Sequence, residues 1–587
     1  MKRQPRAFFA LDFGSATTSA ALIGRVGIRW RLVAHAAAPA STPLELHLTD
    51  LLARVDAADP DLLSSLSPEA DQEARPDIAD LAATLPRLEA RSSPPRRIAV
   101  LAGSRHQRSQ LETAATRAGW AVVSGSADED DPVALSRLAL SPEVGAVLLG
   151  ADRSPSGDEK RHLPMLVALV AAAARCRPEL TVVLAGGAGV HEEAFPESHG
   201  RAAAAAPAGP AADAAAIEDS PGAVTELGPP DETTAAGPRS HNALIAPDAG
   251  AGEPAGAALQ QVLEGLRAAW NDSRLGFARS ISSLASVLDC SIEGIEIGLQ
   301  GGLRCRAEPL APGSKTIVSW HAAPAFASFA PSDPDDGAID GLVAWSPVVL
   351  DRYRVTDRLR DLRISPWGDG DGDGALLRSV AAKAATERAI VATPDISARP
   401  AADLIVAGGG TWASMPPSLA ALAMADLIRR PGVSRLAVDH ACLLGPIGAI
   451  EDEDERCRMI SDLAGDVLLP LGSVIMPAGV RQGRSAGKMT LRPGESGTFP
   501  AIELDLQPGA LEAIDLAPGQ TAVARMEFRD DVRLASRGRN FTVNVAGGLV
   551  GLLVDLREVP LRVSDRSEAR RAALEAWQRV VWAETVE

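Results

Sequence analysis

The stretch Phe8-Phe9-Ala10-Leu11-Asp12-Phe13-Gly14-Ser15-Ala16-Thr17-Thr18 decides how this chain folds. An apolar run leads into Asp12, Gly14 and Ser15, and a second apolar run at residues 20–23 follows at once. This pattern predicts a hairpin whose turn offers backbone N–H groups and small hydroxyls to a phosphate group, because glycine lets the backbone approach a ligand closely. The Asp12 carboxylate is suited to hold a hydrated Mg²⁺ ion. An ordinary tight turn between two strands is the alternative interpretation.

A second informative stretch, Leu404-Ile405-Val406-Ala407-Gly408-Gly409-Gly410-Thr411, joins an apolar strand to three glycines. Glycines in this place let the backbone lie flat against a base and a ribose. The helix that is expected to begin near Pro416 would then direct its N-terminus at the ligand. The alternative is a strand–loop–helix connection of any α/β domain.

Composition and charge exclude several classes of protein. The chain has 587 residues and a formal net charge of -18, which argues against nonspecific binding to nucleic acid or to an anionic membrane surface. Its five cysteines include no C-x-x-C pair, so neither a disulfide framework nor a zinc site is indicated. No run approaches the roughly 18 apolar residues that would span a bilayer. We therefore expect a cytoplasmic protein that does not enter a membrane.

Apolar periodicity predicts a mixed α/β fold. Short, turn-bounded strands suit the antiparallel edge of a mixed sheet, and they are expected at residues 8–13, 20–23 and 30–34. Strands and helices then alternate between residues 97 and 184, which predicts a parallel sheet covered by helices. A second α/β region follows, with strand candidates at residues 294–297, 341–345, 402–406 and 436–438.

Two other segments have a different composition. Residues 191–241 are rich in Ala, Pro, Gly and acidic side chains, and they cannot bury enough apolar surface to offset the entropy of ordering. We expect a disordered insertion there. Beyond residue 468 the apolar residues alternate with polar ones, as in Ala524, Met526 and Phe528, which predicts a β-sandwich or barrel.

Three stretches together resemble one protein family. They are residues 11–18, the run Ala146-Val147-Leu148-Leu149-Gly150-Ala151-Asp152, and residues 404–411 with Leu443-Leu444-Gly445-Pro446-Ile447-Gly448-Ala449 behind them. In these stretches the chain resembles the glutamate mutase L family, also called MutL or GlmL and unrelated to mismatch repair. That family belongs to the actin/Hsp70/sugar-kinase (ASKHA) ATPase superfamily.

The resemblance implies a duplicated actin-like, ribonuclease H-like ATPase fold. Its first lobe would span residues 7–190 and its second lobe residues 242–465, with the disordered insertion of residues 191–241 between them. A C-terminal β-sandwich or barrel domain would span residues 466–563, and a helix would occupy residues 564–587.

The resemblance also implies ATP and Mg²⁺ as cofactors and a cobalamin-dependent mutase as protein partner, for which the chain would be a reactivating or chaperone-like accessory protein. Asp12 would hold the metal through water, and Glu296 would orient the attacking water. The phosphates would be held by Gly14, Ser15, Thr17, Thr18 and Gly298. Adenosine would be held by Gly408, Gly409, Gly410 and Thr411.

Two departures from the family bear on activity. Ser19 stands where the family usually has lysine, and the second phosphate turn, Glu296-Ile297-Gly298-Leu299-Gln300-Gly301-Gly302, lacks the family's threonines and second aspartate. Phosphoryl transfer depends on positioning and electrostatic stabilisation, so such a site would bind nucleotide yet hydrolyse it slowly or not at all. Glu296 is alternatively an exposed charge at a strand edge.

Two other functions therefore stay open at the level of sequence. The first is a catalytically degenerate pseudo-ATPase scaffold that acts through protein–protein contacts. The second is a small-molecule kinase, which would need a carboxylate base that the sequence does not identify.

Overall fold

The computed structural model divides the chain into two compact units. Unit 1 comprises residues 1–95, 116–119 and 264–587, and unit 2 comprises residues 96–115 and 120–263. The structure describes residues 6–66, 77–92, 97–118, 120–151, 157–177, 180–186, 243–246, 259, 262–263, 273–309, 336–364, 372–481, 483, 485–495 and 499–582.

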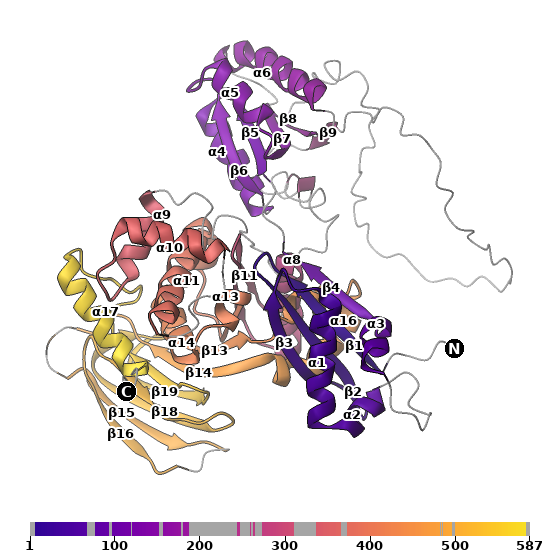
Figure 1. The fold of residues 1–587 in the computed structure, drawn as a ribbon. Helices are drawn as coiled ribbons and strands as arrows, with labels where there is room; N and C mark the ends of the chain where they lie inside the picture. Colours follow the sequence, from indigo (N-terminus) through magenta and orange to yellow (C-terminus); the bar gives the residue numbers. More distant parts are fainter. Residues whose placement is uncertain are drawn as a thin grey trace, which may run out of the picture. The chain divides into compact units, whose positions relative to one another are not determined.

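The N-terminal sheet of unit 1 has the strand order β3-β2-β1-β4 (Figure 1). Its strands are β1 (Ala7–Phe13), β2 (Thr17–Val26), β3 (Arg29–Pro39) and β4 (Arg87–Arg91). Neighbours among β1, β2 and β3 pair antiparallel, whereas β4 runs parallel to β1. The predicted antiparallel edge of a mixed sheet is therefore confirmed.

Alternate side chains of β1 enter two different cores. Phe9 and Leu11 pack with α1 (Leu44–Ala58), α2 (Pro60–Leu66) and α3 (Ile78–Thr84) on the outer face of the sheet. Phe8 and Ala10 point to the opposite face and join a second apolar core. Because successive side chains of a strand alternate, the continuous apolar run of β1 is what a strand buried on both faces requires.

The central sheet of unit 1 has the order β11-β10-β12-β13-β14-β20-β17. Its strands are β10 (Ile292–Ile297), β11 (Gly302–Ala307), β12 (Leu404–Gly408), β13 (Gly432–Asp439), β14 (Leu468–Met476), β17 (Leu511–Ile514) and β20 (Gly551–Asp555). β10 and β11 form an antiparallel hairpin, and β12 runs parallel to β10. The N-terminal sheet has the same arrangement, a hairpin whose first strand has a parallel neighbour.

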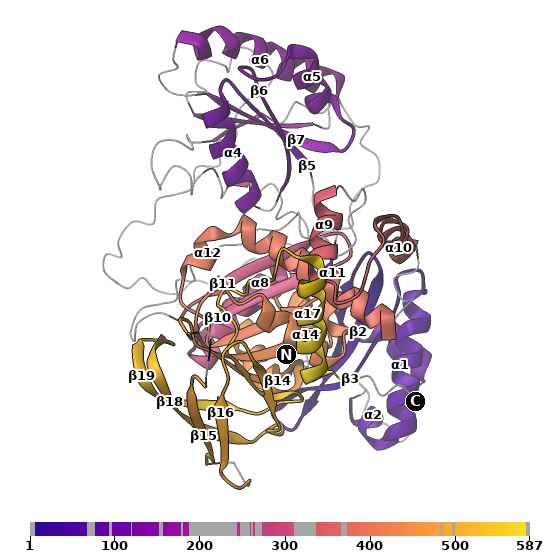
Figure 2. The same ribbon diagram turned by 90° about the vertical axis from the view of Figure 1, so that its left-hand side faces the viewer.

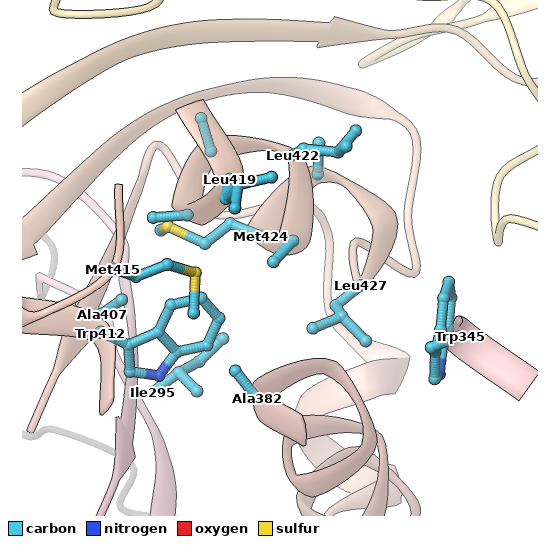
Figure 3. Close-up of a cluster of buried hydrophobic side chains, with 14 of the residues drawn as sticks. Ile295, Trp345, Ala382, Ala407, Trp412, Met415, Leu419, Leu422, Met424 and Leu427 are labelled. Carbon is cyan, nitrogen blue, oxygen red and sulfur yellow. The ribbon is translucent and has the colours of Figure 1, made fainter. Parts of the chain in front are cut away.

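One face of the central sheet is covered by helices around the buried Trp412 and Met415 (Figure 3). The helices in this part of unit 1 are α9 (Asp336–Trp345), α10 (Arg352–Ile364), α11 (Gly372–Ala392), α12 (Pro394–Ala398), α13 (Gly410–Ala413), α14 (Pro417–Asp426) and α17 (Ser567–Val581). The strand predicted at residues 341–345 is wrong, because this run ends α9. Ile339, Leu342 and Trp345 are buried at helical spacing there.

A layer of helices lies between the N-terminal and central sheets. It consists of α8 (Ser273–Leu288), α15 (Leu444–Ile447) and α16 (Glu453–Val467). Its apolar side chains share one core with Phe8 of β1 and Val406 of β12. α8 and α15 touch through their backbones, since a Cβ on Gly448 would lie 1.8 Å from the Gly276 carbonyl oxygen. Only glycines permit this approach.

The C-terminal sheet, with the order β16-β15-β18-β19, is seen in Figure 2. Its strands are β15 (Gly487–Pro493), β16 (Ile502–Leu506), β18 (Thr521–Arg533) and β19 (Arg537–Ala546). The predicted alternation is confirmed, since Ala524, Met526 and Phe528 are buried and face a core shared with β14, β17 and β20. Among the described strands no barrel closes.

The predicted β domain of residues 466–563 is divided between two sheets. β14, β17 and β20 belong to the central sheet, so a boundary near residue 466 would cut that sheet between β13 and β14, which pair over their whole length. Strand pairing of this kind leaves no trace in the periodicity of either strand. α17 (Ser567–Val581) lies within the predicted helix of residues 564–587, of which residues 583–587 are outside the described part of the chain.

Unit 2 is a parallel sheet with helices, as the alternating pattern predicts. The strand order is β6-β5-β7-β8-β9, and every neighbouring pair is parallel. The strands are β5 (Arg97–Ala102), β6 (Ala121–Ser126), β7 (Val144–Ala151), β8 (Thr181–Gly186) and β9 (Ala243–Ala246). The helices are α4 (Arg105–Arg117), α5 (Pro132–Leu140) and α6 (Gly157–Cys176).

The two units do not coincide with the lobes predicted at residues 7–190 and 242–465. Residues 7–92 group with the second half of the chain, because Phe8 shares a core with α8, whereas unit 2 has an apolar core of its own. The predicted disordered insertion of residues 191–241 lies outside the described residues. Over the part of the chain that the structure describes, no helix has the length and apolarity to cross a membrane.

A buried network of ion pairs fastens the C-terminal segment to the helices of unit 1. Asp426 at the end of α14 pairs with Lys383 of α11 and, at 2.8 Å, with the Arg557 Nη1 atom. Arg557 also donates to both carboxylate oxygens of Asp555 at 2.8 and 2.7 Å, and its guanidinium lies over the Trp577 ring of α17. All four charged side chains are nearly inaccessible to solvent, so each depends on its partners to offset the cost of burial.

Asp426→Ala is expected to lower the free energy of unfolding by about 3–5 kcal/mol, because Lys383 and Arg557 would both lose a buried counter-charge. Asp50→Ala is the matched control, since Asp50 pairs with Arg54 on the exposed surface of α1. An exposed pair contributes about 0–1 kcal/mol. Urea unfolding of the full chain measures both variants. A loss for Asp426→Ala no larger than that for Asp50→Ala would contradict the stabilising role of the network.

Candidate functional site

The turn between β1 and β2 is closed by its own backbone. The Gly14 N–H donates to the Thr17 carbonyl at 2.8 Å. A Cβ on Gly14 would lie 2.8 Å from the same oxygen, so the turn in this form requires glycine. Asp12 sits two residues before it, at the carboxyl end of β1 and opposite Ser19 of β2.

The turn between β10 and β11 is built in the same way. The Gly298 N–H donates to the Gly301 carbonyl at 2.8 Å, the same three-residue link as in the first turn. Glu296 sits two residues before this glycine, as Asp12 does in the first hairpin. Its side chain is only 5% exposed, because β10 lies between β11 and β12, so the alternative of an exposed edge charge is wrong.

The glycine triplet follows β12 and lies against both turns. Gly409 has φ +87°, and a Cβ there would lie 2.8 Å from Glu296 Oε1 and 2.7 Å from the Ile297 carbonyl oxygen. A Cβ on Gly410 would lie 3.4 Å from Thr17 Oγ1. The backbone of the triplet therefore passes between the second turn and the first, and at Gly409 a larger residue would not fit.

A cavity of ≈ 350 Å³ opens where the two turns and the triplet meet. This volume lies within the range of small-molecule sites, about 300–1,000 Å³. Of the residues that the sequence analysis assigned to a site, those lining the cavity are Asp12, Gly14, Ser15, Thr17, Glu296, Gly298, Gly409, Gly410 and Thr411.

Two predicted ligand-binding residues do not line the cavity. Thr18 lies on β2 between Thr17 and Ser19, which do line it, so strand alternation turns Thr18 to the opposite face. Gly408 faces α8, where a Cβ would lie 2.4 Å from the Phe277 ring. Gly408 therefore packs against α8, and a role of Thr18 or Gly408 in ligand binding stays a prediction that the lining of the cavity does not support.

The cavity also contains side chains that the sequence analysis did not single out. Arginines reach it from helices distant in sequence, and they are Arg54 of α1, Arg274 of α8 and Arg378 of α11. His35 of β3 and His440 after β13 line it and meet edge to face, with ring centroids 4.9 Å apart. None of these residues belongs to a motif, so no sequence signal marks them.

Burial favours the neutral form of two titratable groups of the cavity, His35 and Cys442. Burial, followed by the neighbouring His440, lowers the pKa of His35. Burial, followed by Asp439 and then Asp12, raises the pKa of the Cys442 thiol. A neutral thiol is a poor nucleophile and a poor metal ligand, so Cys442 is not expected to act as either.

Asp439 supports the wall of the cavity from behind. Its carboxylate accepts hydrogen bonds from the N–H groups of Leu443 and Leu444, both at 2.9 Å, at the start of α15. Burial raises the pKa of Asp439 to about 6, although these two hydrogen bonds act in the opposite direction.

A scan against models of protein families finds no match for this chain, and neither does a search of curated proteins. The functional interpretation consequently depends on the residues of the cavity.

Gly409→Ala is expected to destabilise the chain by more than about 1–2 kcal/mol. A left-handed backbone alone costs a residue with a Cβ about that much. The new Cβ would in addition clash with Glu296. Gly465→Ala is the matched control, since Gly465 lies in α16 with open space around it. That change is expected to stabilise by about 0.5–1 kcal/mol. Chemical unfolding compares them, and equal effects would refute the constraint at Gly409.

The raised pKa of Asp439 should make the free energy of unfolding depend on pH. Its native pKa of about 6 lies above the ordinary value of 3.8, so the native state holds this proton more tightly than the unfolded chain does. Its contribution is therefore present below about pH 4 and is lost as the pH rises through 6. Measured by urea unfolding, the stability of the wild type relative to Asp439→Asn should fall over this interval and then stay constant. A difference that does not vary with pH would contradict the assignment.

Proposed function

We propose that this chain is a Mg²⁺-dependent ATP-binding protein with an actin-like, ribonuclease H-like duplicated fold. The observation that carries the proposal is the convergence of two hairpin turns of the same construction with the glycine triplet on one cavity. In each turn a carboxylate precedes a glycine by two residues. The shared arrangement of the two sheets, a hairpin with a parallel neighbour, supports the duplication.

Three groups of cavity residues have a role in this proposal. Backbone N–H groups of the first turn and the hydroxyls of Ser15 and Thr17 bind phosphate oxygens. The backbone of Gly409 and Gly410, together with Thr411, packs against the nucleoside. Glu296 orients a water molecule toward the terminal phosphate.

Asp12 fits a magnesium ion held through water. Among the described residues, no group of three or more His, Cys, Asp and Glu side chains is placed to hold a metal. A single carboxylate beside a phosphate site is a usual setting for Mg²⁺, which keeps several of its water ligands. When bound, the ion would neutralise charge on the phosphates.

The resemblance to the glutamate mutase L family gives the proposal its biological setting. We propose an accessory role toward a cobalamin-dependent mutase, in which bound nucleotide changes the affinity of the chain for that partner. The helical layer between the two sheets supports such a coupling, because α8 contacts both sheets that bear the turns.

Asp12→Asn is expected to weaken the binding of Mg²⁺-ATP at least about tenfold and that of metal-free ATP by less than about threefold, because it removes one charge from the water shell of the metal. Isothermal titration calorimetry with and without Mg²⁺ separates the two effects. Wild-type protein that gives no heat with any nucleotide would refute the proposed function.

A pseudo-ATPase scaffold is the second candidate function, and the second turn favours it. Gly301 and Gly302 stand where the resemblance calls for threonines, and Gly301 lines the cavity. Loss of one well-placed donor typically costs about 10²–10³ in rate.

We therefore expect the wild type to bind ATP and to hydrolyse it more slowly than about 1 s⁻¹, the lower end for kinases. Glu296→Gln should abolish any residual turnover and leave affinity nearly unchanged, because Glu296 acts on the water. A steady-state phosphate-release assay measures this. Brisk turnover, or turnover that Glu296→Gln does not alter, would show that another residue positions the water.

A further inference from the structure

The cavity carries positive charge for which the proposed function gives no role. Arg54, Arg274 and Arg378 line it, against the carboxylates of Asp12 and Glu296. Three guanidinium groups thus gather at one cavity of a chain whose formal net charge is -18. A cavity with such a lining attracts an anionic ligand.

Two of these arginines are buried in the wall of the cavity. Arg274 is 3% exposed and Arg378 is 9% exposed, whereas Arg54 is largely exposed and pairs with Asp50. Burial lowers the pKa of Arg378. A guanidinium that is buried beside a cavity is costly to keep charged, and an anionic ligand would reduce that cost.

The position of Arg378 is fixed beside the point where the glycine triplet meets the first turn. Its Nη1 atom donates to Ser414 Oγ at 3.0 Å, and that hydroxyl donates to the Gly410 carbonyl at 2.5 Å. Gly410 in turn lies against Thr17. The guanidinium is therefore anchored next to the hydroxyl-bearing turn through two successive hydrogen bonds.

We propose that Arg378, assisted by Arg274 from α8, binds the phosphate groups of the ligand and makes affinity depend on their number. This inference rests on the proposed function. The first turn and the start of β2 supply hydroxyls at Ser15, Thr17 and Ser19 but no cation. A guanidinium supplies the charge together with a planar fork of donors that matches two phosphate oxygens. Arg378 thus determines selectivity for a polyphosphate over a monophosphate.

The test compares the affinities of ATP, ADP, AMP and inorganic tripolyphosphate, each with Mg²⁺, by calorimetry on the full chain. Arg378→Met should weaken the binding of ATP and of tripolyphosphate about 10- to 100-fold, as expected for the loss of a charge-assisted hydrogen bond. The binding of AMP should weaken less than about threefold. Arg378→Lys should fall between wild type and Arg378→Met, because it keeps the charge and loses the fork.

Two controls separate phosphate binding from a merely structural role. Ser414→Ala removes the anchor of Arg378 but keeps its charge, so it should preserve the order ATP, ADP, AMP. Arg492→Met alters an exposed arginine of β15 and should change nothing. Melting temperatures with and without tripolyphosphate show whether each variant is folded.

The outcomes distinguish this inference from the proposed function. Wild type that binds tripolyphosphate but not ATP would refute nucleotide binding and leave the role of Arg378 intact. Equal weakening of ATP and AMP in folded Arg378→Met, or no weakening of either, would refute the role of Arg378. Wild type that binds none of the four ligands would refute both.

Discussion

The close approach of Gly409 to Glu296 is the constraint on which the candidate site depends. Parallel pairing of β10 with β12 sets Glu296 beside Gly408, so the chain must leave β12 directly beneath a buried carboxylate. It does so with φ +87° at Gly409, where a Cβ would lie 2.8 Å from Glu296 Oε1. Only glycine meets both conditions. From there Gly410 reaches Thr17, and the two hairpin turns face one cavity.

The helical layer of α8, α15 and α16 fixes the position of one hairpin relative to the other. Backbone contact between Gly276 and Gly448 brings α8 against α15, and Asp439 holds the start of α15 through two hydrogen bonds. Apolar side chains of α8 then contact β1 on one side and β12 on the other. Because protein interiors are closely packed, movement of one sheet in response to a ligand would displace the other sheet through this layer.

The two turns and the glycine triplet could be predicted from local sequence, because in each of them glycines directly follow an apolar strand. Features that arise from contacts between residues distant in sequence could not be predicted in this way. Arg378 lines the cavity, but it lies on α11 outside any sequence motif. β14 pairs with β13, and the apolar pattern of β14 does not indicate this pairing. Gly408 looks equivalent to Gly409 in sequence, yet Phe277 of α8 gives it a different role. The alternation of strands and helices starts at residue 97, next to the start of unit 2 at residue 96, but the pattern alone does not show that this sheet is separate from the strands of residues 7–39.

Hydrogen–deuterium exchange of the full chain, with and without saturating Mg²⁺-ATP, tests the convergence of the three segments most directly. If one ligand occupies the cavity, exchange should slow together at residues 14–17, 298–301 and 409–411, because residues of all three segments line it. Exchange in unit 2 should not change. Protection confined to unit 2, or to one turn without the other, would contradict a single phosphate site formed by both hairpins.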